Sequence, residues 1–152
     1  MSKMAADHDA LNLSQGFPDF PVSNKLISLV HEHMLLGKNQ YAPMPGVMEL
    51  REAISNSIER KYHVQVNPAT EVTITAGATE GIYAILTAII STDDEVILFD
   101  PAYDCYAPAV RLNGGKPNHL TMKQPDFTID CNEVEQANTP QTKAIIINPP
   151  HN

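Results

Sequence analysis

The sequence has few of the residues that mark secreted, membrane-spanning or nucleic-acid-binding proteins. It has 152 residues and only two cysteines, Cys105 and Cys131, which form neither a disulfide framework nor a metal-type pair. The formal net charge is −8 and no basic cluster is present, which argues against a nucleic-acid partner. The longest apolar run, residues 82–90, is too short to span a bilayer, and residues 1–8 lack the apolar region of a signal peptide. These absences predict a protein of the reducing cytoplasm, with no membrane association.

The composition that remains is that of a folded globular domain. Hydrophobic residues make up 43% of the chain and charged residues 18%, which is enough apolar material for a core. His31 and His33 are two residues apart in a predicted helix, so they do not face one another and no metal site is expected.

Hydrophobic periodicity and turn residues predict alternating helices and strands. The predicted helices cover residues 23–36, 47–62, 78–90, 106–112 and 129–136, and the predicted strands cover residues 71–75, 95–100, 117–122 and 142–148. The helix over 47–62 is amphipathic, with Arg51 among its solvated residues, and the one over 78–90 is apolar nearly all round and therefore expected to be buried. A strand, a helix and a strand within residues 71–100 predict a right-handed crossover in a parallel sheet, and hence an α/β fold. Asp130 or Asn132 is expected to cap the helix over 129–136.

Two strand ends carry residues suited to ligand binding. The turn Ala76-Gly77-Ala78-Thr79 joins a predicted strand to a helix N-terminus, where free backbone N–H groups can hold an anion. Small residues there are equally consistent with a tight connection. Tyr103 follows the strand over 95–100, where its ring can stack on a flat ligand or cap the core.

Five segments, taken in order, resemble one enzyme family. They are Gln15-Gly16-Phe17-Pro18-Asp19-Phe20, Tyr41-Ala42-Pro43-Met44-Pro45-Gly46, Gly77-Ala78-Thr79, Tyr103 and Asn148-Pro149-Pro150-His151-Asn152. With these segments the chain resembles the first part of the fold-type-I aminotransferases that depend on pyridoxal 5'-phosphate (PLP). The similarity is greatest to the class I/II group acting on methionine, kynurenine, glutamine or aromatic amino acids.

The resemblance implies a three-layer α/β/α fold with a mainly parallel sheet, an incomplete large domain and an N-terminal arm. Residues 1–40 would form the arm and the first helix, and residues 41–152 the first part of the PLP-binding large domain. Because a buried-type strand is followed directly by the end of the chain at Asn152, a truncated protein or a fragment is expected.

The resemblance also implies roles for individual residues. Gly77, Ala78 and Thr79 would bind the cofactor phosphate, Tyr103 would stack on its ring, and Asn152 would donate to its phenolic oxygen. Tyr41 would reach the phosphate in a neighbouring subunit, which implies a homodimer with shared active sites. Gly16 and Phe17 would lie beside the substrate, and His151 farther from the ring.

Three residues that transamination requires have no counterpart here. In the family a Schiff-base lysine, an acid for the pyridine nitrogen and an arginine for the substrate carboxylate follow the Asn-Pro-x-Asn motif. None of the seven lysines lies in a Ser/Thr-rich loop of the family's type, and Lys143 lies at the amino end of the strand predicted over residues 142–148. The 152 residues alone are therefore expected to be inactive, while the parent enzyme would transfer an amino group from an amino acid to a 2-oxo acid.

Two other interpretations are open. A naturally short chain could keep the family's scaffold as a non-catalytic binding or assembly module. An ordinary nucleotide-binding domain is the other, although the turn at residues 76–81 lacks the G-x-G-x-x-G fingerprint.

Overall fold

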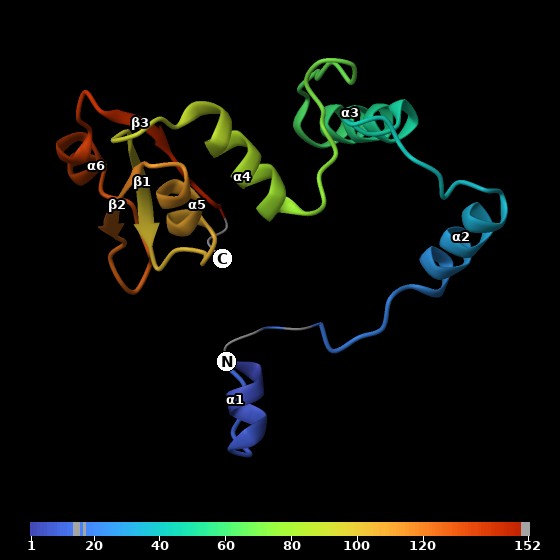
Figure 1. Ribbon diagram of the computed structural model, residues 1–152, viewed down its shortest axis with the longest axis horizontal. Coiled ribbons are helices and arrows are strands. Elements are labelled where there is room, and N and C mark those ends of the chain that lie inside the picture. The colour runs from blue at the N-terminus through green and yellow to red at the C-terminus, as the bar shows by residue number, and fades with distance from the viewer. Residues whose placement is uncertain (14–15, 17, 150–152) are drawn as a thin grey trace. The chain divides into compact units, whose positions relative to one another are not determined.

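A computed structural model describes residues 1–13, 16 and 18–149 of the chain. The structure divides into two units, residues 1–42 and residues 43–152. The first contains the helices α1 (Ser2–Asp7) and α2 (Asn24–Leu35). In the second lie the helices α3 (Met48–Tyr62), α4 (Ala78–Ile89), α5 (Tyr106–Leu112) and α6 (Cys131–Ala137), and the strands β1 (Glu95–Asp100), β2 (Lys116–Thr121) and β3 (Thr142–Ile145) (Figure 1).

The strand β1 is the centre of the second unit. It pairs in parallel with β2 on one side and with β3 on the other, so the sheet order is β2-β1-β3. Successive side chains of a strand point to opposite faces, and both faces of β1 are apolar. Val96, Ile97 and Leu98 are 0% exposed.

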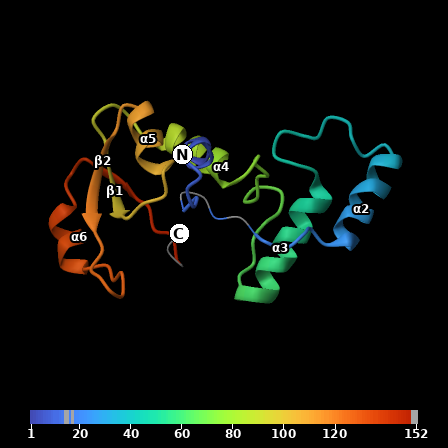
Figure 2. The same cartoon turned by 90° about the horizontal axis from the view of Figure 1, so that it is seen from below.

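Each face of β1 has its own helical cover. Val96 and Leu98 pack with α5 and with Leu86 of α4, whereas Ile97 and Phe99 pack with Met122 and the α6 side chains. Figure 2 shows α6 on one side of the strands and α4 and α5 on the other. The predicted three-layer α/β/α arrangement with a parallel sheet is confirmed.

The predicted strand over residues 71–75 is not formed. The segment is extended, but its backbone bonds to the loop and helix before it: Ile74 N donates to the carbonyl of Pro45 at 3.0 Å. Arg51 of α3 donates from Nε to the carbonyl of Val72 at 2.9 Å and from a terminal nitrogen to that of Ala69 at 2.7 Å. No strand within the described residues lies beside the segment, so the strand–helix–strand unit is β1-α5-β2 and not the one predicted over residues 71–100.

Arg51 is buried, with 6% of its surface exposed, and its predicted place on the solvated side of α3 is wrong. Its guanidinium supplies hydrogen bonds to carbonyls that a neighbouring strand would otherwise satisfy, because buried backbone acceptors require a partner. A buried arginine that bonds two carbonyls holds α3 against the extended segment that leads to α4.

The helix α4 is less buried than its apolar composition predicted. Leu86 is its buried residue, while Tyr83 and Ile85 are 44% and 62% exposed. The cause is that β1 and α5 cover one side of the helix only. The predicted burial of the third strand is also only partial: β3 ends at Ile145, which is 44% exposed.

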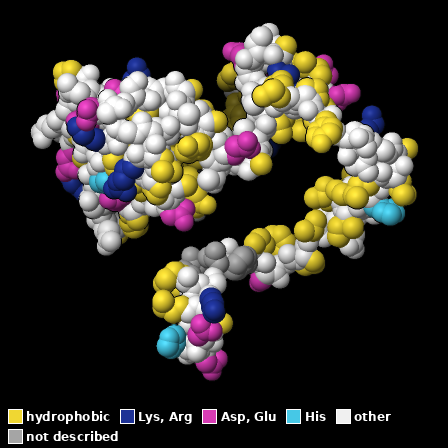
Figure 3. Space-filling view, in the orientation of Figure 1, with side chains coloured by type: hydrophobic (Ala, Val, Ile, Leu, Met, Phe, Trp, Pro, Cys, Tyr) yellow, Lys and Arg dark blue, Asp and Glu magenta, His cyan; other side chains and the backbone are white. Residues whose placement is uncertain are grey.

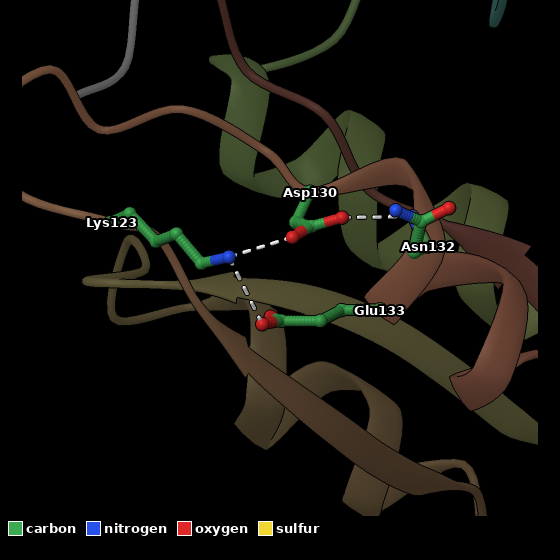
Figure 4. Close-up of polar contacts among 4 residues, drawn as sticks. All are labelled: Lys123, Asp130, Asn132 and Glu133. Atoms are coloured by element: carbon green, nitrogen blue, oxygen red, sulfur yellow. Dashed lines mark hydrogen bonds and ion pairs between the residues drawn. The ribbon is translucent and has the colours of Figure 1, made fainter.

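An ion-pair cluster fixes the loop between β2 and α6. Lys123 Nζ lies 2.6 Å from a carboxylate oxygen of Asp130 and 3.5 Å from one of Glu133 (Figure 4). The other Asp130 oxygen accepts from the backbone N–H of Asn132 at 2.9 Å, so Asp130 is the predicted cap of α6. The hydrogen bond with Lys123 lowers the pKa of Asp130 and raises that of Lys123.

In the first unit, α2 forms where the sequence predicts it, and its apolar side chains are open to solvent. Leu26, Ile27, Val30 and Met34 are 52–56% exposed (Figure 3). The helix α1 was not predicted. No helix among the described residues has the length and apolarity that a membrane crossing demands.

Replacing Arg51 by methionine should lower the free energy of unfolding by about 2 kcal/mol, because the buried carbonyl of Val72 and the partly buried carbonyl of Ala69 lose their donors. Urea unfolding measures the change. Arg60→Met is the matched control: Arg60 is an exposed arginine of the same helix whose Nε bonds within one helical turn, and its loss should change stability by no more than about 0.5 kcal/mol. Equal effects of the two substitutions would contradict this role for Arg51.

Candidate functional site

The turn that precedes α4 has the geometry of an anion-binding turn. Gly77 adopts φ 88° and ψ 166°, a conformation that side chains disfavour. A Cβ added to Gly77 would meet no atom within 4 Å, so the space above the turn is open. The first helical bond runs from Gly81 N to the carbonyl of Gly77, which leaves the N–H groups of Ala78 and Thr79 without an intrahelical acceptor. These donors and the helix dipole favour a negative group at this point.

Thr79 faces the start of α5 across a shallow hollow. The hollow is lined from α4 and the turn before it by Ala76, Thr79, Glu80 and Tyr83, and from α5 and the residue before it by Cys105, Pro108, Ala109 and Leu112. Two segments that are about 25 residues apart in the sequence thus meet beside the turn.

The pKa of the Cys105 thiol depends on its contact with Thr79. Burial raises its pKa above the ordinary thiol value, and the charge of Asp104 raises it further, while the Thr79 hydroxyl, which can donate to the thiolate, lowers it. The net shift is upward, so the thiol is protonated at neutral pH.

The two tyrosines that follow β1, Tyr103 and Tyr106, differ in how far they are buried. Tyr106 is 8% exposed and packs in the core, and burial raises its pKa. Tyr103 is 41% exposed, and its ring centre lies 5.8 Å from that of Tyr106 at an angle of 59°. The core position belongs to Tyr106, and Tyr103 keeps a ring surface that a flat ligand can contact.

The other predicted site residues lie in the first unit or outside the described residues. Gly16 and Tyr41 belong to the first unit, where Tyr41 is fully exposed and a Cβ on Gly16 would meet no atom within 4 Å. Phe17, His151 and Asn152 lie outside the described residues. Lys143 is the second residue of β3, at the amino end of the strand.

The residues of the turn and of the loop after β1 fit a flat anionic cofactor. Gly77 allows close approach, and the N–H groups of Ala78 and Thr79 and the Thr79 hydroxyl are donors for a phosphate. Tyr103, two residues before the Cys105 that borders the same hollow, has a partly exposed aromatic ring. Within the described residues no group of three His, Cys, Asp or Glu side chains could hold a metal ion. Backbone N–H groups and a hydroxyl are donors suited to a phosphate, and we call Gly77, Ala78 and Thr79 the candidate phosphate seat.

Sequence reasoning missed Glu80, Cys105 and an apolar hollow at the carboxyl ends of the strands. Glu80 was detectable, because a glutamate three residues after the N-cap Gly77 has the spacing of a capping box. Cys105 carried no local signal, since its contact with the turn depends on how α5 packs. Loops after all three strands form the apolar hollow, whose lining residues are Phe99, Tyr106, Met122, Phe127, Ile129, Ile146, Ile147, Asn148 and Pro149.

The family of the chain follows from comparison with known proteins. The family model described as aminotransferase class I and II matches residues 8–152. The chain therefore belongs to the class I and II aminotransferase family, and its resemblance to the N-terminal part of a fold-type-I aminotransferase is confirmed.

Individual relatives agree with this assignment. The methionine aminotransferase of Escherichia coli K12 is 47% identical over 152 residues, which are 100% of this chain and 39% of the relative. A probable N-succinyldiaminopimelate aminotransferase of Mycobacterium tuberculosis is 39% identical over 155 residues, again 100% of this chain and 39% of the relative. The crystal structure of YbdL from Escherichia coli, described as a methionine aminotransferase, superposes with a TM-score of 0.93 at 46% identity, over 99% of this chain and 40% of that one. The chain spans about two fifths of the length of these relatives.

The pH dependence of Cys105 alkylation tests the contacts of the hollow. In a Cys131→Ser background, iodoacetamide should label Cys105 with a midpoint above the ordinary thiol pKa, because burial disfavours the thiolate. Asp104→Asn should move the midpoint down by removing a nearby negative charge, and Thr79→Val should move it up by removing a donor to the thiolate. Shifts of the two variants in the same direction would contradict the arrangement.

Proposed function

We propose that this chain is the N-terminal part of a PLP-dependent aminotransferase whose complete polypeptide transfers an amino group from an amino acid to a 2-oxo acid. Residues 1–40 form the arm and first helix, and residues 41–152 begin the PLP-binding large domain. The observation that carries the proposal is the open turn at Gly77, at the N-terminus of a twelve-residue helix, in a chain of the aminotransferase family.

PLP, when bound, supplies an electron sink that makes bonds to the amino-acid α-carbon labile. The N–H groups of Ala78 and Thr79 and the Thr79 hydroxyl would hold its phosphate and so position its ring. Tyr103 would pack on the ring and exclude water from that face, and Asn152 would donate a hydrogen bond to the phenolic oxygen. Such positioning by rigid donors is how a protein gains rate without reorganising at the moment of reaction.

The remaining site residues act from the arm and from a second subunit. Gly16 and Phe17 lie beside the substrate, where glycine permits close approach of its carboxylate. Tyr41 donates to the phosphate held by a neighbouring subunit, so the active enzyme is a homodimer with shared sites. The full exposure of Tyr41 within its unit is consistent with a partner outside it.

The Schiff-base lysine, the acid for the pyridine nitrogen and the carboxylate-binding arginine lie outside these 152 residues. The chain alone is therefore inactive, and the enzyme works in the cytoplasm as a complete polypeptide. Methionine is the first amino donor to test, because the Escherichia coli methionine aminotransferase is 47% identical.

Removal of the Thr79 hydroxyl tests the phosphate seat. In the complete natural polypeptide, Thr79→Val should weaken PLP binding about tenfold, since a hydrogen bond to a charged group is lost. Pyridoxal, which has no phosphate, should bind both proteins equally. Titration followed by absorbance or fluorescence gives both dissociation constants.

Thr87→Val is the matched control, because Thr87 is an exposed threonine farther along the same helix. It should leave PLP binding unchanged. If Thr79→Val bound PLP as tightly as the unmodified protein, or lost pyridoxal affinity to the same extent, the turn would not be the phosphate seat.

A further inference from the structure

A fixed negative charge stands beside the turn that is suited to an anion. The Glu80 carboxylate accepts a hydrogen bond from the backbone N–H of Ala76, the residue before Gly77. Glu80 also lines the same hollow as Thr79. A carboxylate here is unexpected if the surroundings serve only to attract a phosphate, because like charges at close range repel.

The contact has a clear structural effect. The hydrogen bond from Ala76 to Glu80 links the start of the turn to the first turn of α4. A second hydrogen bond, from the Thr75 hydroxyl to the carbonyl of Gly77 at 3.0 Å, also holds the turn in place. The turn is thus formed before any ligand arrives, and preorganisation reduces the entropy that ordering a binding loop would otherwise consume. In the first helical turn the carboxylate also interacts favourably with the helix dipole.

The same carboxylate opposes the ligand. A unit negative charge that borders the same hollow repels a phosphate there and lowers its affinity several-fold, even when solvent screens the charge strongly. The two effects are separable, because glutamine keeps the accepting oxygen and removes the charge, while alanine removes both.

We propose that Glu80 is a positioning residue that locks the phosphate-binding turn and at the same time limits its affinity for the phosphate. This inference rests on the proposed function of the turn. Glu80 therefore sets how readily the cofactor phosphate is released, in addition to capping the helix.

Glu71 provides a matched control within the chain. Its carboxylate accepts from the backbone N–H of Asn67 at 2.7 Å, which is the same four-residue spacing, and it lies outside the turn. Glu71→Gln thus removes one negative charge from a side chain that makes an equivalent local hydrogen bond but does not border the candidate phosphate seat.

The test uses inorganic phosphate as the ligand and the complete natural polypeptide, freed of cofactor, as the protein. Isothermal titration in a phosphate-free buffer compares the unmodified protein with Glu80→Gln, Glu80→Ala, Glu71→Gln and Thr79→Val. Glu80→Gln should bind phosphate about three- to tenfold more tightly at low salt, and the gain should shrink at high salt because salt screens the charge. Glu71→Gln should change nothing, and Glu80→Ala should bind more weakly than Glu80→Gln.

Amide hydrogen exchange tests the lock independently of any ligand. The Ala76 amide should be protected in the unmodified protein and in Glu80→Gln, and it should exchange faster in Glu80→Ala. An Ala76 amide that exchanges equally fast in all three proteins would overturn the inference.

The results also separate this inference from the proposed function. Phosphate binding that depends on Thr79 but is the same in Glu80→Gln as in the unmodified protein overturns the role of Glu80 and leaves the phosphate seat intact. Phosphate binding that is absent, or indifferent to Thr79→Val, overturns both.

Discussion

Burial of β1 on both faces, together with backbone pairing on both edges, is the constraint on which the second unit depends. A strand that is paired in parallel on both sides cannot shift its register without moving Glu95 or Asp100 into the buried positions of the strand. Its carboxyl end is therefore fixed, and the loop that follows begins at a defined point with Tyr103 and Cys105. The α4 residues that pack on the same face of β1 bring the first turn of α4 to that loop. Thr79 and Cys105 meet because both of their elements are held by one strand.

The candidate site is therefore a product of packing as well as of local motif. The turn at Gly77 supplies backbone donors, and the loop after β1 supplies a protonated thiol that contacts Thr79 and, two residues earlier, the partly exposed ring of Tyr103. Neither half would define a cofactor site by itself. In the proposed arrangement Glu80 has two opposing effects: its hydrogen bond to Ala76 keeps the turn formed, which favours binding, whereas its negative charge opposes a phosphate.

The features that the sequence predicts correctly are those decided by neighbouring residues. The run Val96-Ile97-Leu98 predicts a buried parallel strand, the stripe of α3 predicts its length to within one residue, and Asp130 is recognisable as a cap. The failures depend on residues far away. Residues 71–75 have strand-like composition, but Arg51 and Pro45 take up their backbone groups. Similarly, α4 is apolar on all sides, yet its burial depends on how many elements cover it.

The site shows the same division. The expectation that residues 76–79 bind an anion comes from small residues at a helix start, and the positive φ of Gly77 is compatible with it. The packing of α5 brings Cys105 to Thr79. It also places Tyr106, and not Tyr103, in the core. No local sequence pattern predicts this packing. The family resemblance was the stronger guide here, since it joined separate segments by their order, and the match over residues 8–152 confirms it.

The central claim is that this segment holds the cofactor's phosphate and ring while the lysine that binds its aldehyde lies elsewhere in the polypeptide. The direct measurement is to load the complete natural polypeptide with PLP and reduce it with borohydride. Peptide mapping by mass spectrometry then identifies the modified lysine. The account predicts one modified lysine outside these 152 residues. Modification of any of the seven lysines in this chain, or of no lysine at all, would contradict it.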